Sequence, residues 1–147
     1  MKYRLLYVSK ALHPWETLDP VLMDILSEAI AFNSKNNITG VLYYGQGFFV
    51  QCLEGDKQSV ENLFYQKILK DPRHHHCEIL YAADIETSLF HQWSMKFAPV
   101  NKNIRDFFEN YHLDEFNPYL LTENTTLPFI HVLAKEPHYE VNPAKFS

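Results

Sequence analysis

The feature that most constrains the fold is the order in which strand patterns and helix patterns follow one another along the chain. Five segments have the alternation and composition of strands, at 3–9, 38–44, 48–55, 77–86 and 92–98. Two segments have apolar residues at spacings of three and four, as on one face of a helix, at 19–35 and 57–70. The predicted order is therefore strand, helix, strand, strand, helix, strand, strand.

This order restricts the architecture, because each helix has to return the chain across the strands that it connects. The economical solution is an α+β domain, a ferredoxin-like βαββαββ sheet with two helices on one face and the fifth strand as an extension. The other face is then bare, and a third helical pattern at 101–112 could cover it or pack against another subunit. We expect one domain at 1–98 and a C-terminal helical and irregular extension at 99–147.

The C-terminal segment is difficult to predict in detail. Residues 113–147 contain four prolines, two before and two after a short apolar run at 129–134. We expect a helical turn or two there, followed by a frayed end.

Composition excludes some classes of protein. The net charge of −5 argues against direct nucleic-acid binding through a broad basic surface. No run of about 18 apolar residues occurs and no signal peptide precedes the first strand, so we expect a cytoplasmic protein with no membrane segment. The many aromatic residues, 11 Phe, 9 Tyr and 2 Trp, suit a planar ligand or a protein interface as well as an ordinary core.

Gln51 stands out in the third strand, FFVQCLEG at 48–55. With a period of two it shares its face with Phe49 and Leu53, both large and apolar. A buried carboxamide left without hydrogen-bond partners costs roughly 1–3 kcal/mol for each unpaired group. A polar partner is therefore expected on the same face.

Two further polar residues point to that face. Tyr7 lies on the first strand and Asn33 on the inner row of the first helix. The three side chains could simply satisfy one another. Together they also form the polar edge of a pocket for a flat, hydrogen-bonding ring, with Ile25 and Ile68 as apolar walls from the two helices.

Charged residues gather where the second helix ends. They are Lys67, Lys70, Arg73 and His74. Cations are favoured at a helix C-terminus in any case, but they would also suit a phosphate carried by a ligand between the helices. We do not expect a metal in the run HHHC at 74–77, because neighbouring residues of an extended chain point to opposite sides. Sequence motifs of common enzymes, GxGxxG, GxSxG and HExxH among them, are absent from the sequence.

Taken together, these residues resemble the BLUF domain family, blue-light photoreceptors that use flavin, over roughly 2–98, in its short single-domain type. The matching pieces are YRLLY at 3–7, FN at 32–33, NITG at 37–40, FVQCLEG at 49–55, KDPRH at 70–74 and WSM at 93–95. No single piece is specific, but their order and spacing are.

The resemblance implies a bound FAD, with FMN as an alternative, whose ring lies between the two helices. Tyr7 then matches the photoactive tyrosine and Gln51 the essential glutamine. The resemblance implies further cofactor contacts at Ile25, Asn33, Lys67, Ile68, Asp71, Arg73 and His74. Many members have arginine where this chain has Lys67, so the grip on the phosphate is weaker here.

The resemblance also implies a mechanism. Tyr7 gives an electron and a proton to the excited flavin through Gln51, and Gln51 is left rotated or tautomerised, which shifts the flavin absorption slightly to the red. The signal would leave through Trp93, Ser94 and Met95 and the C-terminal segment to a protein partner such as a transcriptional regulator, with a homo-oligomer also compatible.

Two other classes of function compete with this interpretation. One is a light-independent ferredoxin-like regulatory or binding module. The other is a small hydrolase, for which the sequence offers no nucleophile and base pair. We expect a sensor rather than an enzyme.

Overall fold

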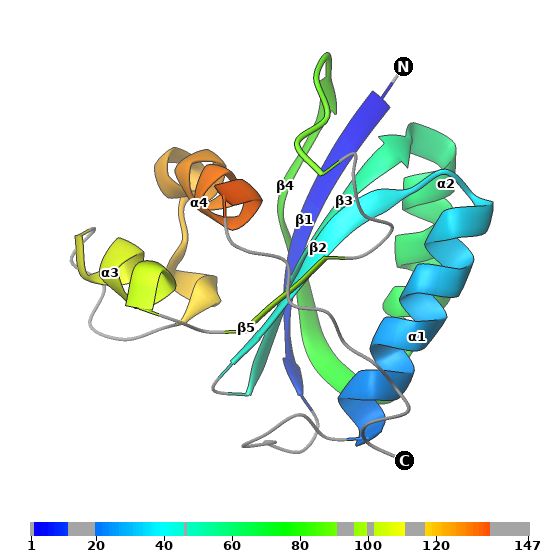
Figure 1. Ribbon diagram of the computed structural model, residues 1–147, viewed down its shortest axis with the longest axis horizontal. Helices are drawn as coiled ribbons and strands as arrows, with labels where there is room; N and C mark the ends of the chain where they lie inside the picture. Colours follow the sequence, from blue (N-terminus) through cyan, green and yellow to red (C-terminus); the bar gives the residue numbers. More distant parts are fainter. Residues whose placement is uncertain are drawn as a thin grey trace.

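The computed structural model describes residues 2–11, 20–45, 47–90, 96–99, 102–110 and 117–135. In this part of the chain a five-stranded sheet lies between two layers of helices (Figure 1). The strands, in the sheet order β4-β1-β3-β2-β5, are β4 His74–Ile85, β1 Lys2–Ala11, β3 Phe48–Asp56, β2 Thr39–Gly45 and β5 Lys96–Pro99. All neighbours are antiparallel except β2 and β5, which are parallel.

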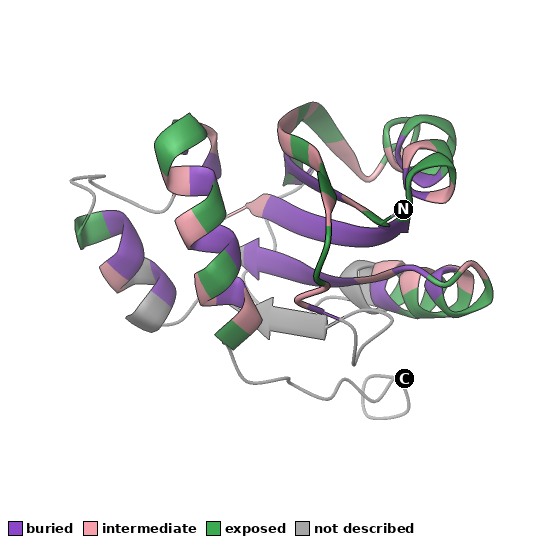
Figure 2. Ribbon diagram, turned by 90° about the horizontal axis from the view of Figure 1, so that it is seen from above, coloured by how far each residue is buried: buried purple, intermediate pink, exposed green. Residues whose placement is uncertain are grey.

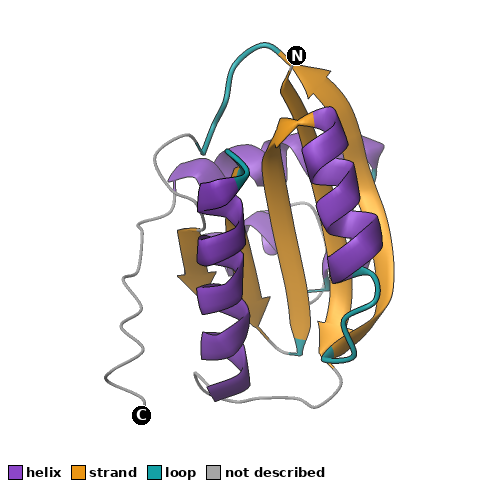
Figure 3. Ribbon diagram, turned by 90° about the vertical axis from the view of Figure 1, so that its right-hand side faces the viewer, coloured by secondary structure: helices purple, strands orange, loops and turns teal. Residues whose placement is uncertain are grey.

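The helices divide between the two faces of the sheet. On one face lie α1 Pro20–Lys35 and α2 Lys57–Leu63, side by side in Figure 3. On the other lie α3 Lys102–Asn110 and α4 Glu123–Lys135, with the short 3-10 helix η2 Pro118–Leu120 between them in sequence (Figure 2). The predicted α+β, ferredoxin-like βαββαββ fold is confirmed. Of the predicted fifth strand, 92–95 lies outside the described residues.

Each face of the sheet has its own apolar core, as the alternation along β3 predicts. Phe49 and Leu53 pack in the core beneath α1 and α2, on the same face as Gln51. Val50 and Cys52 pack in the opposite core with residues of α3 and α4. The face that the sequence leaves bare is thus covered by α3, as predicted, and also by α4.

The expectation of only a turn or two near 129–134 is wrong, because α4 is a helix of 13 residues. Pro128 lies inside it, where proline normally costs about 3 kcal/mol. Thr126, Phe129, Ile130 and Leu133 recur at helical spacing and are buried against the sheet. The free energy gained by burying this face outweighs the local cost of the proline. This gain depends on packing against the sheet, so it cannot be predicted from the local sequence.

The predicted second helix is divided. After α2 the chain continues as a π-helical turn, η1 Phe64–Ile68, in which the Leu69 N–H donates to the Phe64 carbonyl at 2.8 Å. The apolar spacing of the segment predicts a helix but not this widening of its backbone hydrogen bonds. The turn carries Lys67 and Ile68, both predicted to contact the ligand.

A buried ion pair joins the sheet to the segment that follows β4. Arg4 on β1 and Glu54 on β3 are 5% and 1% exposed, and the Arg4 Nε donates to Glu54 Oε2 at 2.8 Å. The other oxygen, Oε1, accepts from the Ser88 hydroxyl at 2.6 Å and from the Phe90 N–H at 2.9 Å. Glu54 therefore fixes the chain on its way from β4 towards β5.

We predict that Glu54→Gln lowers the free energy of unfolding by about 3 kcal/mol, because the buried Arg4 cation loses its partner. Urea denaturation measures this. Glu109→Gln, which removes the same charge from an exposed position on α3, is the control and should change stability by less than about 0.5 kcal/mol. Equal losses in the two variants would contradict the prediction.

Candidate functional site

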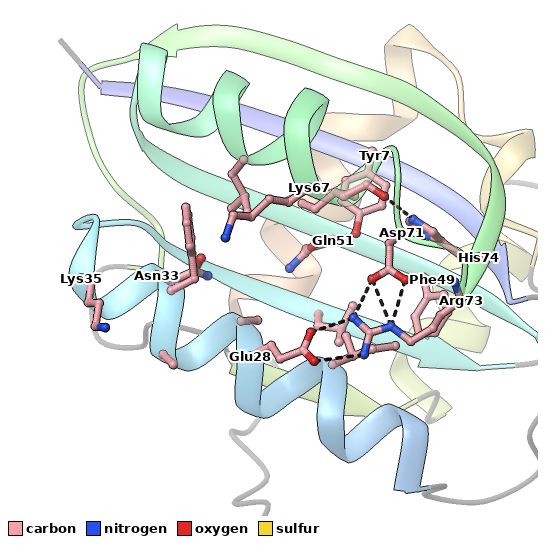
Figure 4. A pocket seen from close by; sticks show the side chains of 17 residues that line it. Tyr7, Glu28, Asn33, Lys35, Phe49, Gln51, Lys67, Asp71, Arg73 and His74 are labelled. Atoms are coloured by element: carbon pink, nitrogen blue, oxygen red, sulfur yellow. Dashed lines mark hydrogen bonds and ion pairs between the residues drawn. The ribbon is translucent and has the colours of Figure 1, made fainter.

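A cavity of about 470 Å³ lies between α1, the α2–η1 helix and the sheet (Figure 4). The structure brings nine sequence-predicted site residues to its lining, namely Tyr7, Ile25, Asn33, Gln51, Lys67, Ile68, Asp71, Arg73 and His74. These residues come from β1, α1, β3, η1, the segment that leads into β4 and the first residue of β4. The predicted signalling residues Trp93, Ser94 and Met95 lie outside the described residues.

Tyr7 and Gln51 form the floor of the cavity. They stand directly opposite each other in the antiparallel pair of β1 and β3, whose register is regular over its whole length. Directly opposed side chains on one face lie about 5 Å apart at their Cβ atoms. The Tyr7 hydroxyl donates to Gln51 Oε1 at 2.5 Å, and the two residues are only 4% and 5% exposed.

The environment of Tyr7 keeps its proton in place. Burial raises the pKa of Tyr7 well above its ordinary value of 10.0, and the nearby Cys77 and Asp71 raise it further. The phenol therefore remains protonated at neutral pH. It acts as the donor, and the Gln51 carbonyl oxygen acts as the acceptor.

His74 lies beside Tyr7, with its ring edge-on at 6.3 Å between ring centroids. Its Nε2 is 2.6 Å from the Ile68 carbonyl, which can only accept, so Nε2 carries the proton of this bond. Its Nδ1 is 2.7 Å from the hydroxyl of the buried Ser9. His74 thus connects η1 to β1 beside Tyr7, and it also lines the cavity.

Two side chains of α1 line one wall of the cavity. Asn33 is 1% exposed, and the half-buried Ile25 lies two turns earlier on the same helix face. Ile68 faces the cavity from η1. The walls are therefore apolar, while hydrogen-bonding groups lie at the floor and at the Asn33 end.

The rim of the cavity, formed by Glu28, Lys67, Asp71 and Arg73, carries charge. Arg73 donates through Nε to Asp71 Oδ1 at 2.9 Å and through a terminal nitrogen to Asp71 Oδ2 at 2.6 Å. The same nitrogen is 2.8 Å from Glu28 of α1. Lys67 places its Nζ over the Phe32 ring, 4.2 Å from the ring centroid.

This arrangement modifies the predicted cluster of cations. Arg73 is bound to two carboxylates. Lys70 does not line the cavity, and its Nζ donates to Gln66 Oε1 at 3.2 Å. Glu28 was not among the residues predicted from the sequence. A signal was present, since Glu28 lies three residues after Ile25 and four before Phe32, on the helix face that lines the cavity.

The reason given against a metal in the run 74–77 is wrong for two of its residues. His76 has a positive φ of 56°, and the pairing of β1 with β4 shifts register between Val8 and Lys10. Strict alternation is therefore lost, and the Nδ1 atoms of His75 and His76 approach to 2.6 Å. Among the described residues, no group of three or more metal-binding side chains is present.

The cavity fits a flavin in size and in chemistry. Its volume lies within the range of about 300–1,000 Å³ that is typical of small-molecule sites. Apolar walls suit the faces of a flat ring, the amides of Gln51 and Asn33 suit its polar edge, and the Arg73 and Lys67 cations suit a phosphate at the rim.

Comparison with known proteins decides the family. The model for sensors of blue-light using FAD, BLUF, matches residues 2–96. The chain belongs to the BLUF family. It is a flavin-binding blue-light sensor, as its resemblance to the family implies.

Individual relatives agree with this assignment. The alpha subunit of photoactivated adenylate cyclase from Euglena gracilis is 43% identical over 86 residues, which cover 58% of this chain and 8% of that protein. The structure described as the BlsA photo-activated state is 41% identical, with a TM-score of 0.90 over 96% of this chain and 100% of that chain. The dark state of the BLUF protein BlrB is 26% identical, with a TM-score of 0.70 over 90% and 95%.

The BLUF relatives differ in how much of their own length matches this chain. BlsA and BlrB match over nearly their whole chains, whereas the cyclase matches over a small part of its length. Within the described part of the BLUF chain, no helix has both the length and the apolar character needed to cross a bilayer.

The rim leads to a prediction about pH. Burial acts to raise the pKa of Asp71, but hydrogen bonds from the Arg73 side chain and backbone outweigh it and hold the pKa below its ordinary value of 3.8. Because the folded-state pKa is lowered, the pair stabilises the fold above about pH 4 and this contribution is lost as pH falls through the folded-state value.

We predict that Arg73→Gln raises the pKa of Asp71 to its ordinary value or above, since burial remains when the side-chain hydrogen bonds are lost. A carbon-13 NMR titration of the Asp71 carboxyl measures it. An unchanged pKa in the variant would show that Arg73 does not hold the carboxylate.

Proposed function

We propose that Tyr7 and Gln51 are the photoactive pair of this sensor. The observation that carries the proposal is the hydrogen bond from the Tyr7 hydroxyl to Gln51 Oε1 at the buried floor of the cavity. When bound, the flavin supplies the absorption of blue light and, in its excited state, a strong electron acceptor.

The remaining lining residues are proposed to hold and orient the flavin. Ile25 and Ile68 stand on the helices to either side of the ring, and Asn33 offers its amide to the polar edge. Lys67, Asp71, Arg73 and His74 lie where the ribityl and phosphate part leaves the cavity. Arg73 has the fork geometry that suits a phosphate, which favours FAD or FMN over a flavin without phosphate.

The proposed switch consists of proton movement along the observed hydrogen bond. When Tyr7 loses an electron, its phenolic proton becomes strongly acidic and moves to Gln51 Oε1, the only acceptor that Tyr7 is seen to contact in the described structure. When electron and proton return to Tyr7, the Gln51 carboxamide is left rotated or tautomerised. The stored signal is then a changed set of hydrogen bonds and not a new covalent bond.

The sheet offers a short route for the output. Ile79, Tyr7, Gln51, Leu42 and Phe97 are successive partners across β4, β1, β3, β2 and β5. A change at Gln51 is therefore two strands away from β5, and β5 leads into α3 on the opposite face. We propose that the signal leaves by β5 and the extension at 99–147 towards a protein partner, with a transcriptional regulator as the expected class.

We predict that the wild-type protein is yellow and that blue light shifts its absorption bands reversibly to the red. Tyr7→Phe should retain the flavin and lose the shift, because the ring still fills the floor but has no proton to give. Absorption spectra before and after illumination measure both. A Tyr7→Phe variant that photoconverts normally would exclude Tyr7 as the donor, and a colourless wild-type protein would favour a light-independent module.

We further predict that Gln51→Leu retains the flavin and fails to photoconvert normally. Leucine fills a similar volume but leaves the Tyr7 hydroxyl without its acceptor. The same spectra, with flavin content determined after denaturation, separate loss of the switch from loss of the cofactor. A normal red shift in Gln51→Leu would show that the rearranging group lies elsewhere.

A further inference from the structure

Arg73 is held from two sides by carboxylates of unequal strength. Asp71, two residues away in the chain, accepts from Nε, from a terminal nitrogen and from the Arg73 backbone N–H, and its side chain is 22% exposed. Glu28 approaches from α1, across the cavity mouth, and its side chain is 66% exposed. Figure 4 shows the guanidinium between them.

The bond to Glu28 is the weaker of the two. One Glu28 oxygen lies 2.8 Å from a terminal nitrogen of Arg73, but the second contact is long, at 3.5 Å. Exposed ion pairs contribute little, because water and salt screen them and a long side chain has to be ordered. Asp71 therefore keeps its place on Arg73, whereas Glu28 is readily displaced.

A phosphate would need the same edge of Arg73 that Glu28 occupies. Carboxylates and phosphates both accept two parallel hydrogen bonds from the guanidinium fork. Asp71 already uses Nε and one terminal nitrogen, so the outward edge with the two terminal nitrogens is what remains for a ligand.

We propose that Glu28 occupies the phosphate position on Arg73 and competes with the phosphate of an incoming flavin, so that Glu28 sets how strongly the site prefers FMN or FAD to riboflavin. The inference rests on the proposed placement of the flavin in this cavity. A flavin with a phosphate has to displace Glu28 and then shares the rim with a repelled carboxylate. Riboflavin has no phosphate and is indifferent to Glu28.

The neighbouring cation does not remove this competition. Lys67 holds its ammonium group above the Phe32 ring, which carries no net charge, so it remains available to attract a phosphate. Of the two rim carboxylates, Glu28 can be substituted while the ion pair between Arg73 and Asp71 stays in place. Its removal raises the charge of the rim by one unit.

The test compares dissociation constants of riboflavin, FMN and FAD for the full chain stripped of flavin, measured in the dark by quenching of flavin fluorescence. In Glu28→Gln, which keeps the size of the side chain, affinity for FMN and FAD should rise about fivefold. Affinity for riboflavin should stay unchanged. The gain should shrink as salt is raised, because screening weakens the repulsion that the variant removes.

Two further variants serve as controls. Glu109→Gln changes the net charge of the chain by the same amount from α3, on the far side of the sheet, and should alter none of the three affinities. In an Arg73→Gln background, Glu28→Gln should no longer improve FMN binding by the same factor, because the contested guanidinium is gone.

The outcomes distinguish this inference from the proposed function. Equal changes for all three flavins in Glu28→Gln would mean that Glu28 acts on the shape of the cavity, and would overturn the inference alone. An unchanged preference of Glu28→Gln for FMN over riboflavin would also overturn the inference alone. If the wild-type chain binds none of the three flavins, the proposed site is wrong and the inference falls with it.

Discussion

The hydrogen bond between Tyr7 and Gln51 depends on the register of two central strands. Both residues belong to a ladder between β1 and β3 that runs without a bulge from Lys2 to Lys10. A shift of one residue would turn Gln51 to the opposite face, away from Tyr7 and into the core that contains Val50 and Cys52. The position of the pair is thus a property of the sheet and not of flexible loops.

The other neighbour of β1 is less regular. The pairing with β4 shifts between Leu6 and Tyr7 and again between Val8 and Lys10, so irregular pairing brackets Tyr7 on that side. These shifts accompany the placement of His74 against Ser9. A regular ladder therefore aligns the donor with its acceptor, while the irregular one lies next to the segment before β4, which carries Asp71 and Arg73 at the cavity rim.

The cavity combines a dry floor with a wet rim. Tyr7 and Gln51 are almost fully buried, and at the floor a hydrogen bond is little affected by solvent. Glu28 and Lys67 at the rim are exposed, and their interactions are weak and open to exchange. This difference in burial suits a ligand whose ring has to be positioned accurately at the floor, while its charged tail only has to be bound at the rim.

The sequence by itself determined most of the elements, the face on which Gln51 lies and nine of the residues that line the cavity. Periodicity is a local property of the chain, and the family motifs occur in a fixed order along it, so both can be recognised without the tertiary structure. Tertiary structure alone decided that α4 forms despite Pro128, that His76 breaks the alternation of β4, and that Glu28 meets Arg73. Each of these depends on groups far apart in the chain. Their energies come from burial and charge contacts that exist only once the elements have packed.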